Sequence, residues 1–346
     1  MKRLAIPLPA LAQRSNLALA AHKAAHGKTR RPAVAAFLAD ADARLAALAR
    51  SILAGTAPQG GARQFVIHDP KRRTITAACF DDRVLHHAIL NLAAPRFEQA
   101  LTDAAFACRP GRGVHAAVAA VQRTLQRNAW VVQVDVDGYF PSISHAVLQA
   151  QLVRQFKGAG LLALLGRILA AGAVAPGRGL PIGALTSQHF ANGYLGSADR
   201  LLQAHPGVQG VVRYMDDIVW GCASRAVADA SLAALRAHLA GALHLRLKHG
   251  VVLRPAAQGL AFCGFRIRPG VVLPGARKLQ RYKAAVRRLQ AAALAGTPAA
   301  LLQRAHDASV AALLPAQSSQ LRRRQWWPDD SLTAGASPPP GGASGL

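Results

Sequence analysis

The chain has 346 residues, 51% of them hydrophobic, and its 42 Lys and Arg against 16 Asp and Glu give a formal net charge of +26. Positive charge spread along the whole chain favours phosphate-rich partners first and an anionic membrane surface second, although a GC-rich genome rich in Ala and Arg codons is an alternative cause.

The four cysteines have no CxxC spacing, which argues against a zinc site or a disulfide framework and favours a reducing cytoplasm. The apolar run at the start contains two prolines and the run at 160–177 contains Arg167, so we expect neither a signal peptide nor a membrane span.

Apolar residues at helical spacing predict helices within 16–55, and alternation on both sides of Asp69-Pro70 predicts a strand, a turn and a strand over 63–80. Asp81 and Asp82 are expected to cap the helix that follows. Because helices and strands come in mixed order, the expected fold class is α+β. The next predicted elements are helices over 83–101 and 113–128, a strand over 130–140, and helices to about 173 and over about 186–203. After these we expect two short strands around Met215-Asp216, a helix over 226–243, strands within 259–273 and basic helices within 277–313.

The segment VRYMDDIVWG places Asp216 and Asp217 side by side in an apolar, strand-like run. Adjacent carboxylates repel each other and resist desolvation, so something must compensate them. One compensation is a turn that tips both carboxylates into water. The other is a bound divalent cation, which prefers oxygen ligands. The segment by itself leaves both open.

A second acidic segment, VVQVDVDGYF, alternates valines on one face with Gln133, Asp135 and Asp137 on the other. If it pairs with the first acidic segment in one sheet, Asp135 meets Asp216. Converging carboxylates in so basic a protein make a site for two divalent cations about 3.5–4 Å apart, the arrangement that in-line phosphoryl transfer uses. Asp137 precedes Gly138 and is expected to be a solvated strand end instead.

These segments resemble the motifs of reverse transcriptases, in the order of that family. VDVDGYFPSI resembles the first palm motif, GLPIGALTSQ the second, RYMDDIVWG the Y-x-D-D motif (here YMDD), and GLAFCGFRI the primer-grip strand. Upstream, FVIHDPKRRTITAACF resembles the fingers, and AFACRPGRG resembles the motif after them. The resemblance covers roughly residues 15–290.

The resemblance implies a right-hand polymerase with fingers, a palm made of an antiparallel sheet and helices, and a short helical thumb. We expect an N-terminal helical segment at 1–60, fingers and palm at 61–268, and a basic helical thumb at 269–325. The low-complexity tail at 326–346 is expected to be disordered.

Within the family, IGALTSQ together with ACRPGRG and RYMDDIV resembles the reverse transcriptases of diversity-generating retroelements. The APQGG at 57–61 mimics a group II intron motif, but it precedes the fingers, so we interpret it as a loop. The subclass implies an RNA-directed DNA polymerase that makes cDNA with errors at adenines, for mutagenic retrohoming. The alternatives are a bacterial reverse transcriptase of antiphage-defence or group II intron type, and an inactive nucleic-acid-binding relative.

The resemblance assigns catalysis to Asp135, Asp216 and Asp217. Two Mg²⁺ ions, with Mn²⁺ as a substitute, are expected at Asp135 and Asp216, with the Val136 carbonyl as a third ligand and Asp217 in support. Lys248 matches a general acid for pyrophosphate only loosely, so a surface lysine is the preferred interpretation.

The resemblance also implies residues that bind the incoming nucleotide. Lys71 and Arg73 on the fingers suit a triphosphate. Phe140 is expected to exclude a 2′-hydroxyl, with a plain core position as the alternative. Gly183 and Gln188 match the motif that contacts nucleotide and template.

Ile182 stands where group II intron enzymes commonly have Gln, so we expect it to govern fidelity. Arg72, Arg109 and Arg112 are expected to contact nucleic-acid phosphates, which position the partner without specifying its sequence. The expected partners are template RNA, a DNA primer or cDNA, and dNTPs. A basic accessory protein is a further candidate, no membrane partner is expected, and the location is expected to be cytoplasmic.

Overall fold

The structure is a computed structural model that describes residues 2–58, 61–68 and 72–318. Helices and strands follow one another in mixed order, which confirms the expected α+β class. The strands within the four-stranded sheet, the three-stranded sheet and the sheet of β2 (Ala62–His68) and β3 (Arg72–Ala78) are antiparallel. Among the described residues, the one pair of strands that runs parallel joins the short β1 (Leu4–Ala5) and β5 (Phe156–Lys157). No helix in the described ranges is both long enough and apolar enough to cross a bilayer.

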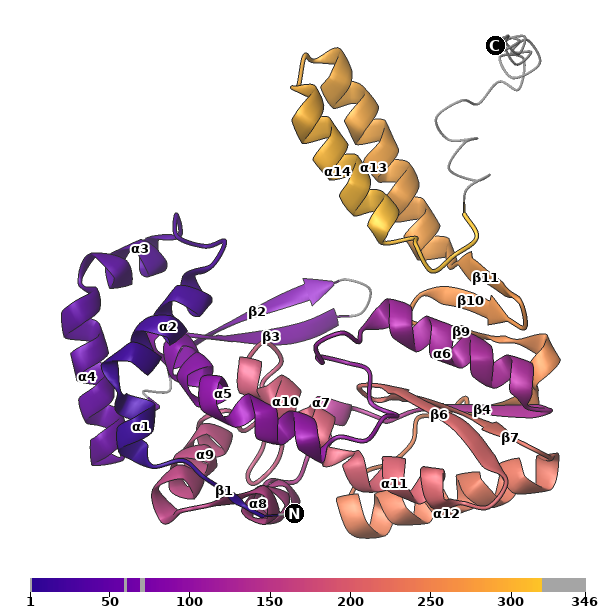
Figure 1. Cartoon of the computed structure of the whole chain (residues 1–346), viewed down its shortest axis with the longest axis horizontal. Helices are drawn as coiled ribbons and strands as arrows, with labels where there is room; N and C mark the ends of the chain where they lie inside the picture. Colours follow the sequence, from indigo (N-terminus) through magenta and orange to yellow (C-terminus); the bar gives the residue numbers. More distant parts are fainter. Residues whose placement is uncertain (1, 59–60, 69–71, 319–346) are drawn as a thin grey trace, which may run out of the picture.

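The N-terminal helices pack on the body of the molecule (Figure 1). They are α1 (Leu8–Ala12), α2 (Arg14–Ala25), α3 (Pro32–Ala39) and α4 (Ala41–Ala54), of which the last three match the helices predicted within 16–55, whereas α1 precedes that range. The last of them ends at Gly55, whose φ of 73° suits a residue without a Cβ. Leu17 and Leu48 are buried in the same hydrophobic core as Ile89 of α5 (Phe80–Ala100), so these helices share the main core.

The strands β2 (Ala62–His68) and β3 (Arg72–Ala78) form the predicted antiparallel hairpin, whose turn at 69–71 lies outside the described residues. Helix α5 follows directly. Its N-cap is Cys79, whose thiol accepts a hydrogen bond from the Asp82 N–H at 3.5 Å, so the predicted capping by Asp81 and Asp82 is wrong. Both carboxylates instead lie in the first helical turn, where the helix dipole favours negative charge.

A four-stranded antiparallel sheet in the order β6-β7-β4-β8 forms the centre of the fold. Its strands are β6 (Val208–Tyr214), β7 (Asp217–Cys222), β4 (Trp130–Asp135) and β8 (Val252–Pro255). The register places Asp135 opposite Asp217 and Trp130 opposite Cys222. The two acidic segments therefore pair in one sheet as predicted, but the residue opposite Asp135 is Asp217 and not Asp216. The two strands predicted around Met215-Asp216 are β6 and β7.

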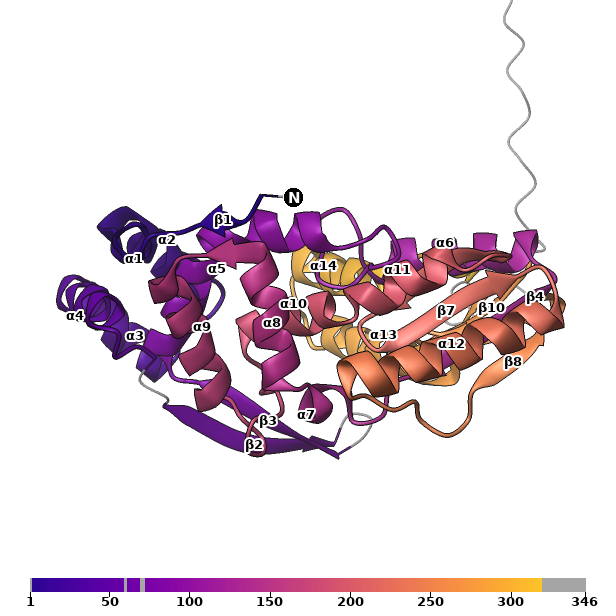
Figure 2. The ribbon, with the colours of Figure 1, turned by 90° about the horizontal axis from the view of Figure 1, so that it is seen from below.

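Both faces of this sheet are covered (Figures 1 and 2). The covering helices are α6 (Val114–Arg127) on one face and α11 (Gly196–Ala204) and α12 (Arg225–Leu243) on the other. Val132 and Val134 belong to the core on the side of α11 and α12, whereas Val131 belongs to the core on the side of α6. The alternation predicted for this strand is thus confirmed.

The predicted strand over 130–140 is too long, because β4 ends at Asp135. Gly138 takes a φ of 49°, and its carbonyl accepts from the Ser142 N–H at 3.0 Å, which starts the short helix α7 (Tyr139–Ser142). Pro141 lies in this first turn, where a missing N–H leaves no intrahelical bond unmade. The helices that follow are α8 (His145–Gln155), α9 (Ala159–Ala171) and α10 (Leu185–Tyr194).

The C-terminal part consists of a small sheet and a helical hairpin that projects from the body (Figure 1). Its elements are β9 (Leu260–Phe262), β10 (Phe265–Arg268), β11 (Val271–Pro274), α13 (Ala276–Leu294) and α14 (Ala299–Ala311). The basic helices expected within 277–313 are thus two antiparallel neighbours, with a small core of Tyr282, Val286 and Leu313. The tail predicted at 326–346 lies outside the described residues, and the segment boundaries at 60 and 268 stay predictions.

Candidate active site at the end of the central sheet

The turn between β6 and β7 carries the acidic pair. Tyr214 pairs with Asp217 across the hairpin, so Met215 and Asp216 are the two turn residues. Met215 is left-handed, with a φ of 57°, which is uncommon for a residue with a side chain. The Asp216 carbonyl accepts from the Val136 N–H at 3.3 Å, which ties the turn to the end of β4.

Asp135 lies at the end of β4 and forms an ion pair with Lys248. The Lys248 backbone N–H also donates to the Asp135 carbonyl at 2.8 Å, so the segment after α12 runs along the end of β4. Lys248 is therefore not the free surface lysine that the sequence favoured. Its ammonium already serves as a counter-ion for one of the three predicted carboxylates.

Asp217 is held differently from its neighbour. Gln133 donates from Nε2 to Asp217 Oδ1 at 2.9 Å and also to the Ala261 carbonyl at 3.0 Å. Burial raises the pKa of Asp217 to about 7, although the Gln133 hydrogen bond opposes the shift. Burial also raises the pKa of Asp216, and the negative charge of Asp135 adds to this effect.

The three carboxylates do not form a ready-made cage. Within the described ranges there is no group of three or more His, Cys, Asp or Glu side chains placed to share a metal ion. Asp135 and Asp216 interact electrostatically, whereas Asp217 is engaged by Gln133. This donor set still fits Mg²⁺, which is commonly bound through one or two carboxylates and completed by waters and substrate phosphates.

The β2–β3 hairpin meets the palm side at the predicted nucleotide motif. The Thr76 N–H donates to the Ile182 carbonyl at 2.9 Å. Gly183, with a φ of 120°, faces the same strand, and a Cβ placed there would lie 3.0 Å from the Thr76 carbonyl oxygen. Arg73 and Arg72 are exposed on β3, and the positive charge of Arg73 opposes the rise that burial causes in the pKa of Asp216.

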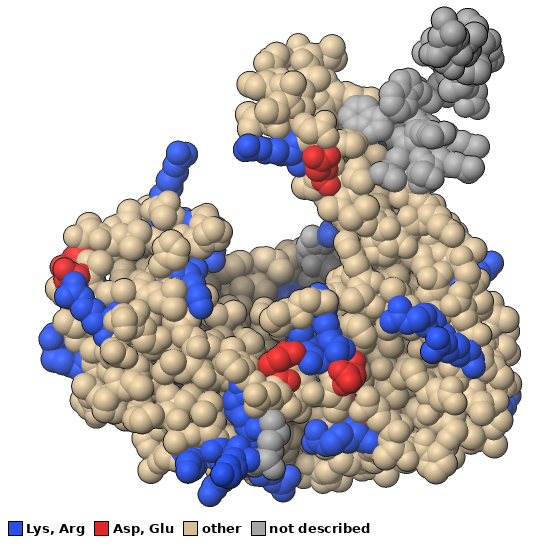
Figure 3. All heavy atoms as spheres, in the orientation of Figure 1, with Lys and Arg blue, Asp and Glu red and all other residues tan. Residues whose placement is uncertain are grey.

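Arg73 is thus a cation on β3 whose charge reaches Asp216. Lys71 lies outside the described residues. The molecule is hollowed between the lobe of the N-terminal helices and the α13–α14 hairpin, with Lys and Arg on both sides of the hollow (Figure 3).

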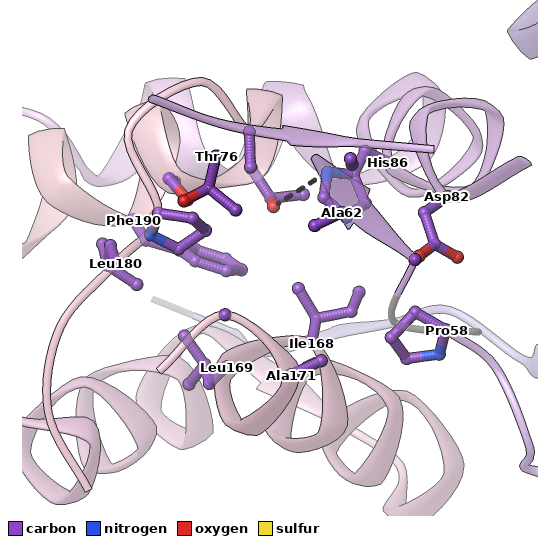
Figure 4. A pocket seen from close by; sticks show the side chains of 17 residues that line it. Pro58, Ala62, Thr76, Asp82, His86, Ile168, Leu169, Ala171, Leu180 and Phe190 are labelled. Atoms are coloured by element: carbon purple, nitrogen blue, oxygen red, sulfur yellow. Dashed lines mark hydrogen bonds between the residues drawn. The ribbon is translucent and has the colours of Figure 1, made fainter. Parts of the chain in front are cut away.

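Behind the contact between hairpin and palm lies an apolar pocket between β2–β3 and the helices α9 and α10 (Figure 4). Leu169, Phe190 and the buried His86 line it, and the Thr186 hydroxyl lies 3.4 Å from His86 Nδ1. Burial lowers the pKa of His86 to about 4, and the neighbouring His87 adds to the shift. His86 is therefore a neutral packing residue near pH 7.

Phe140 and Gln188 are two further residues predicted to contact the nucleotide. Phe140 is half-buried, its ring centroid lies 5.8 Å from that of Tyr139 in an edge-to-face contact, and its carbonyl accepts from the Leu180 N–H at 2.9 Å. Gln188 is exposed, and its Oε1 accepts from the Cys108 thiol at 3.6 Å. Both side chains reach solvent, which a nucleotide contact requires.

The two arginines of ACRPGRG are engaged within the protein. Arg109 pairs with Glu98 at 2.6 Å and donates to the carbonyls of Thr102 at 2.6 Å and Ala105 at 2.9 Å, with only 8% of its side chain exposed. This arrangement disfavours the phosphate contact predicted for Arg109, because its donors are already used. Arg112 pairs with Asp103 at 2.6 Å and stays partly exposed.

The sequence missed one polar group close to the turn. Arg213, on β6, is fully buried with Asp199 of α11. The signal was present, because a charged residue three positions before an acidic pair follows two valines in VQGVVRYMDD. Its partner, 14 residues earlier on a helix, has no local signature.

Residues 67–249 match the family described as reverse transcriptase (RNA-dependent DNA polymerase). The chain is 27% identical to protein YkfC of Escherichia coli (strain K12) over 143 residues, which cover 38% of each chain. It is 25% identical to the group II intron-encoded protein LtrA of Lactococcus lactis subsp. cremoris over 153 residues, which cover 42% of this chain and 26% of LtrA. Apo telomerase from Candida tropicalis superposes with a TM-score of 0.49 at 10% identity, covering 76% of this chain and 59% of that one.

The chain thus spans well under half the length of these two curated relatives. The family match covers more than half of this chain and includes both acidic segments and the nucleotide motif. The α+β arrangement of antiparallel sheets and helices is the right-hand polymerase fold of that family. From the matched residues and the carboxylates at the end of its central sheet, we conclude that the chain belongs to the reverse transcriptase family.

Proposed function

We propose that the chain is an RNA-directed DNA polymerase that copies a template RNA into cDNA from a DNA primer and dNTPs. The observation that carries the proposal is the placement of Asp135 and Asp216 at the end of one sheet, joined by the Val136–Asp216 backbone hydrogen bond at 3.3 Å. A buried carboxylate whose pKa is raised further by the charge of Asp135, in a protein rich in Lys and Arg, suits the binding of cations and polyphosphate.

In this proposal, Asp135 and Asp216 hold two Mg²⁺ ions, or Mn²⁺ in their place, with the Val136 carbonyl as a further ligand. When bound, the ions activate the attacking hydroxyl and stabilise the leaving pyrophosphate. Asp217 accepts the hydrogen bond of Gln133 and so supports the site from β7. Because Asp135 already faces Lys248, the cations and the ammonium compete for the same carboxylate.

The substrate-binding roles follow from the side chains around the carboxylates. Arg73, with Lys71, binds the triphosphate, and the exposed Arg72 and the partly exposed Arg112 bind the nucleic-acid backbone. Phe140 lies under the sugar and excludes a 2′-hydroxyl. Gly183 and Gln188 contact the nucleotide and the template.

We assign the chain to the reverse transcriptases of diversity-generating retroelements, which implies errors at template adenines and mutagenic retrohoming. IGALTSQ, ACRPGRG and RYMDDIV support this assignment. Ile182 supports it as well, because its side chain offers shape but no hydrogen bond to the nascent pair. A basic accessory protein would be a partner of this enzyme. A group II intron type is the second candidate, favoured by the similarity to LtrA.

We also assign 61–268 to fingers and palm and 269–325 to the thumb, and we place the enzyme in the cytoplasm. The four cysteines support that location, because all four are free thiols and none is paired in a disulfide.

Primer extension on a defined RNA template with Mg²⁺ tests the activity. Wild-type protein should make cDNA, and Asp216→Asn should lose at least about 100-fold in rate while binding primer–template nearly as well, because the basic hollow is unchanged. Asp137→Asn is the matched control, since Asp137 is an exposed carboxylate two residues after Asp135. Full activity of Asp216→Asn would refute the assignment.

Sequencing the cDNA tests the subclass. Errors should concentrate opposite template adenines. Ile182→Gln should make them rarer, because one added hydrogen bond raises the discrimination against a wrong nucleotide by about 1–3 kcal/mol. An even error spectrum over the four template bases in both proteins would contradict the diversity-generating assignment and leave the polymerase assignment standing.

A further inference from the structure

Arg213 and Asp199 form a fully buried ion pair beneath the turn that carries Asp216. Neither side chain has any exposed surface. The contact is bidentate, from Arg213 Nε to Asp199 Oδ1 at 2.7 Å and from an Arg213 terminal nitrogen to Asp199 Oδ2 at 2.8 Å. Thr102 donates a further bond to Asp199 Oδ2 at 3.2 Å.

The remaining donors of Arg213 are used as well. They go to the Asn192 side-chain oxygen at 3.0 Å, the Asn192 carbonyl at 2.9 Å and the Met215 carbonyl at 3.2 Å. A guanidinium has five N–H groups, so every one of them has an acceptor. The Arg213 backbone is also fixed, because its N–H donates to the Ala104 carbonyl and its carbonyl accepts from the Phe106 N–H.

The contact with Met215 reaches the turn itself. Met215 is left-handed, with a φ of 57°, a conformation that a residue with a Cβ keeps only where its surroundings hold it. The next residue is Asp216, whose carbonyl is tied to Val136 next to Asp135. A shift of the turn would therefore move Asp216 relative to Asp135.

We propose that Arg213 and Asp199 are a positioning pair that holds the strained Met215 turn and so sets the place of Asp216 beside Asp135. The inference rests on the proposed function, because it concerns the same carboxylates. A buried ion pair stabilises a fold little more than apolar residues of similar volume would. Stability alone therefore does not explain why charges are buried beneath the turn, whereas holding the Met215 carbonyl in place does.

The test replaces the pair by apolar residues and compares folding with metal binding. The variants are Arg213→Met/Asp199→Leu, the same pair with Met215→Gly, and Arg213→Lys. The matched control is Arg225→Met/Asp229→Leu, which removes an exposed ion pair of 3.7 Å on α12. The readouts are thermal melting, Mn²⁺ binding followed by electron paramagnetic resonance, primer–template affinity and kcat.

The apolar double variant should melt cooperatively and bind primer–template within about twofold of wild type, while Mn²⁺ binding and kcat fall about 10- to 100-fold, the scale of a misplaced reactive group. Adding Met215→Gly should recover part of the Mn²⁺ affinity, because glycine takes a positive φ without strain. A folded double variant with wild-type Mn²⁺ affinity and kcat would overturn the proposal, as would the absence of any gain from Met215→Gly.

If the double variant does not fold, Arg213→Lys decides. A lysine keeps the charge beside Asp199 but cannot reach all five acceptors, so Mn²⁺ should bind more weakly, and unchanged Mn²⁺ affinity would refute the positioning role. A wild-type protein that extends no primer would contradict the proposed function alone, because the Mn²⁺ titration still compares the variants.

Discussion

Lys248 and Asp135 form an ion pair at the end of the central sheet, where Asp135 also stands opposite Asp217 in the strand register. About a third of the Lys248 side chain and under half of the Asp135 side chain are exposed, with fractions of 33% and 45%. The ammonium therefore occupies a partly solvated position next to the proposed cation ligands.

Lys248→Met should strengthen the binding of Mn²⁺ about fivefold in the absence of nucleotide, because a positive charge that repels the metal is removed. The change corresponds to about 1 kcal/mol, reduced from the buried value because solvent screens the pair. Isothermal titration measures the affinity. Arg246→Met, an exposed cation two residues away, is the control, and weaker Mn²⁺ binding in Lys248→Met would contradict the competition.

Gly183→Ala should raise the KM for dNTPs and leave primer–template affinity within about twofold, at a cost to the hairpin contact of about 1–3 kcal/mol. The added Cβ would lie 3.0 Å from the Thr76 carbonyl oxygen and 3.1 Å from Ile75 Cγ2, on a backbone with a φ of 120°. Gly177→Ala controls for strain alone, since Gly177 has a positive φ and a Cβ added there would meet nothing within 4 Å. Equal KM values in the two variants would argue against a role of this contact in nucleotide binding.

Primer–template affinity should fall steeply between about 50 and 200 mM salt. In a plot of the logarithm of the affinity against the logarithm of the salt concentration, each contacted phosphate should contribute about −0.7 to −0.9 to the slope. Arg277, Arg281 and Arg288 share one face of α13 by their spacing of four and seven residues. Their triple replacement by Gln should flatten the slope by up to about 3. Fluorescence anisotropy measures it, Arg304→Gln on α14 is the control, and a flat salt dependence in the wild type would exclude an extended basic interface.

His86 should make the fold less stable in acid. Its pKa is about 4 in the folded chain against 6.5 for a free side chain, so the unfolded state binds more protons between these values and stability falls as the pH drops through them. From pH 7 to pH 5 the loss is about 2 kcal/mol. Urea unfolding should show this loss in wild type and in the exposed control His115→Gln, and a smaller one in His86→Leu. An equal loss in all three would exclude His86 as the source.

The sequence predicted those features that depend on local pattern. Period-two alternation placed Asp135 and Val132 on opposite faces of a strand, and the apolar runs around Asp216 predicted the β6–β7 hairpin. The same local pattern overextended β4 beyond Asp135, because a positive φ at Gly138 leaves no mark on hydrophobic alternation.

Contacts between distant segments were the part that the sequence could not supply. Lys248 reaches Asp135 across 113 positions. Even the nearer partners of Arg109, which are Glu98 and two carbonyls after α5, have no pattern in the sequence. The identity of a charged residue does not show whether its side chain faces solvent or an acceptor inside the protein. Only the packing of α11 under β6 decides that Arg213 is internal.

The position of β4 between two partner strands has a consequence for local opening of the fold. It pairs with β7 along Trp130–Asp135 and with β8 along Trp130–Gln133, whereas β2 and β3 have only each other as strand partners and leave Phe65 and Val66 exposed at 43% and 40%. Amide hydrogen exchange should therefore be slow along Trp130–Gln133 and fast along the β2–β3 hairpin. Asp135 ends a strand that opens late, and the cations of β3 are carried by a hairpin that opens early, so a nucleotide can order the hairpin without disturbing the strand.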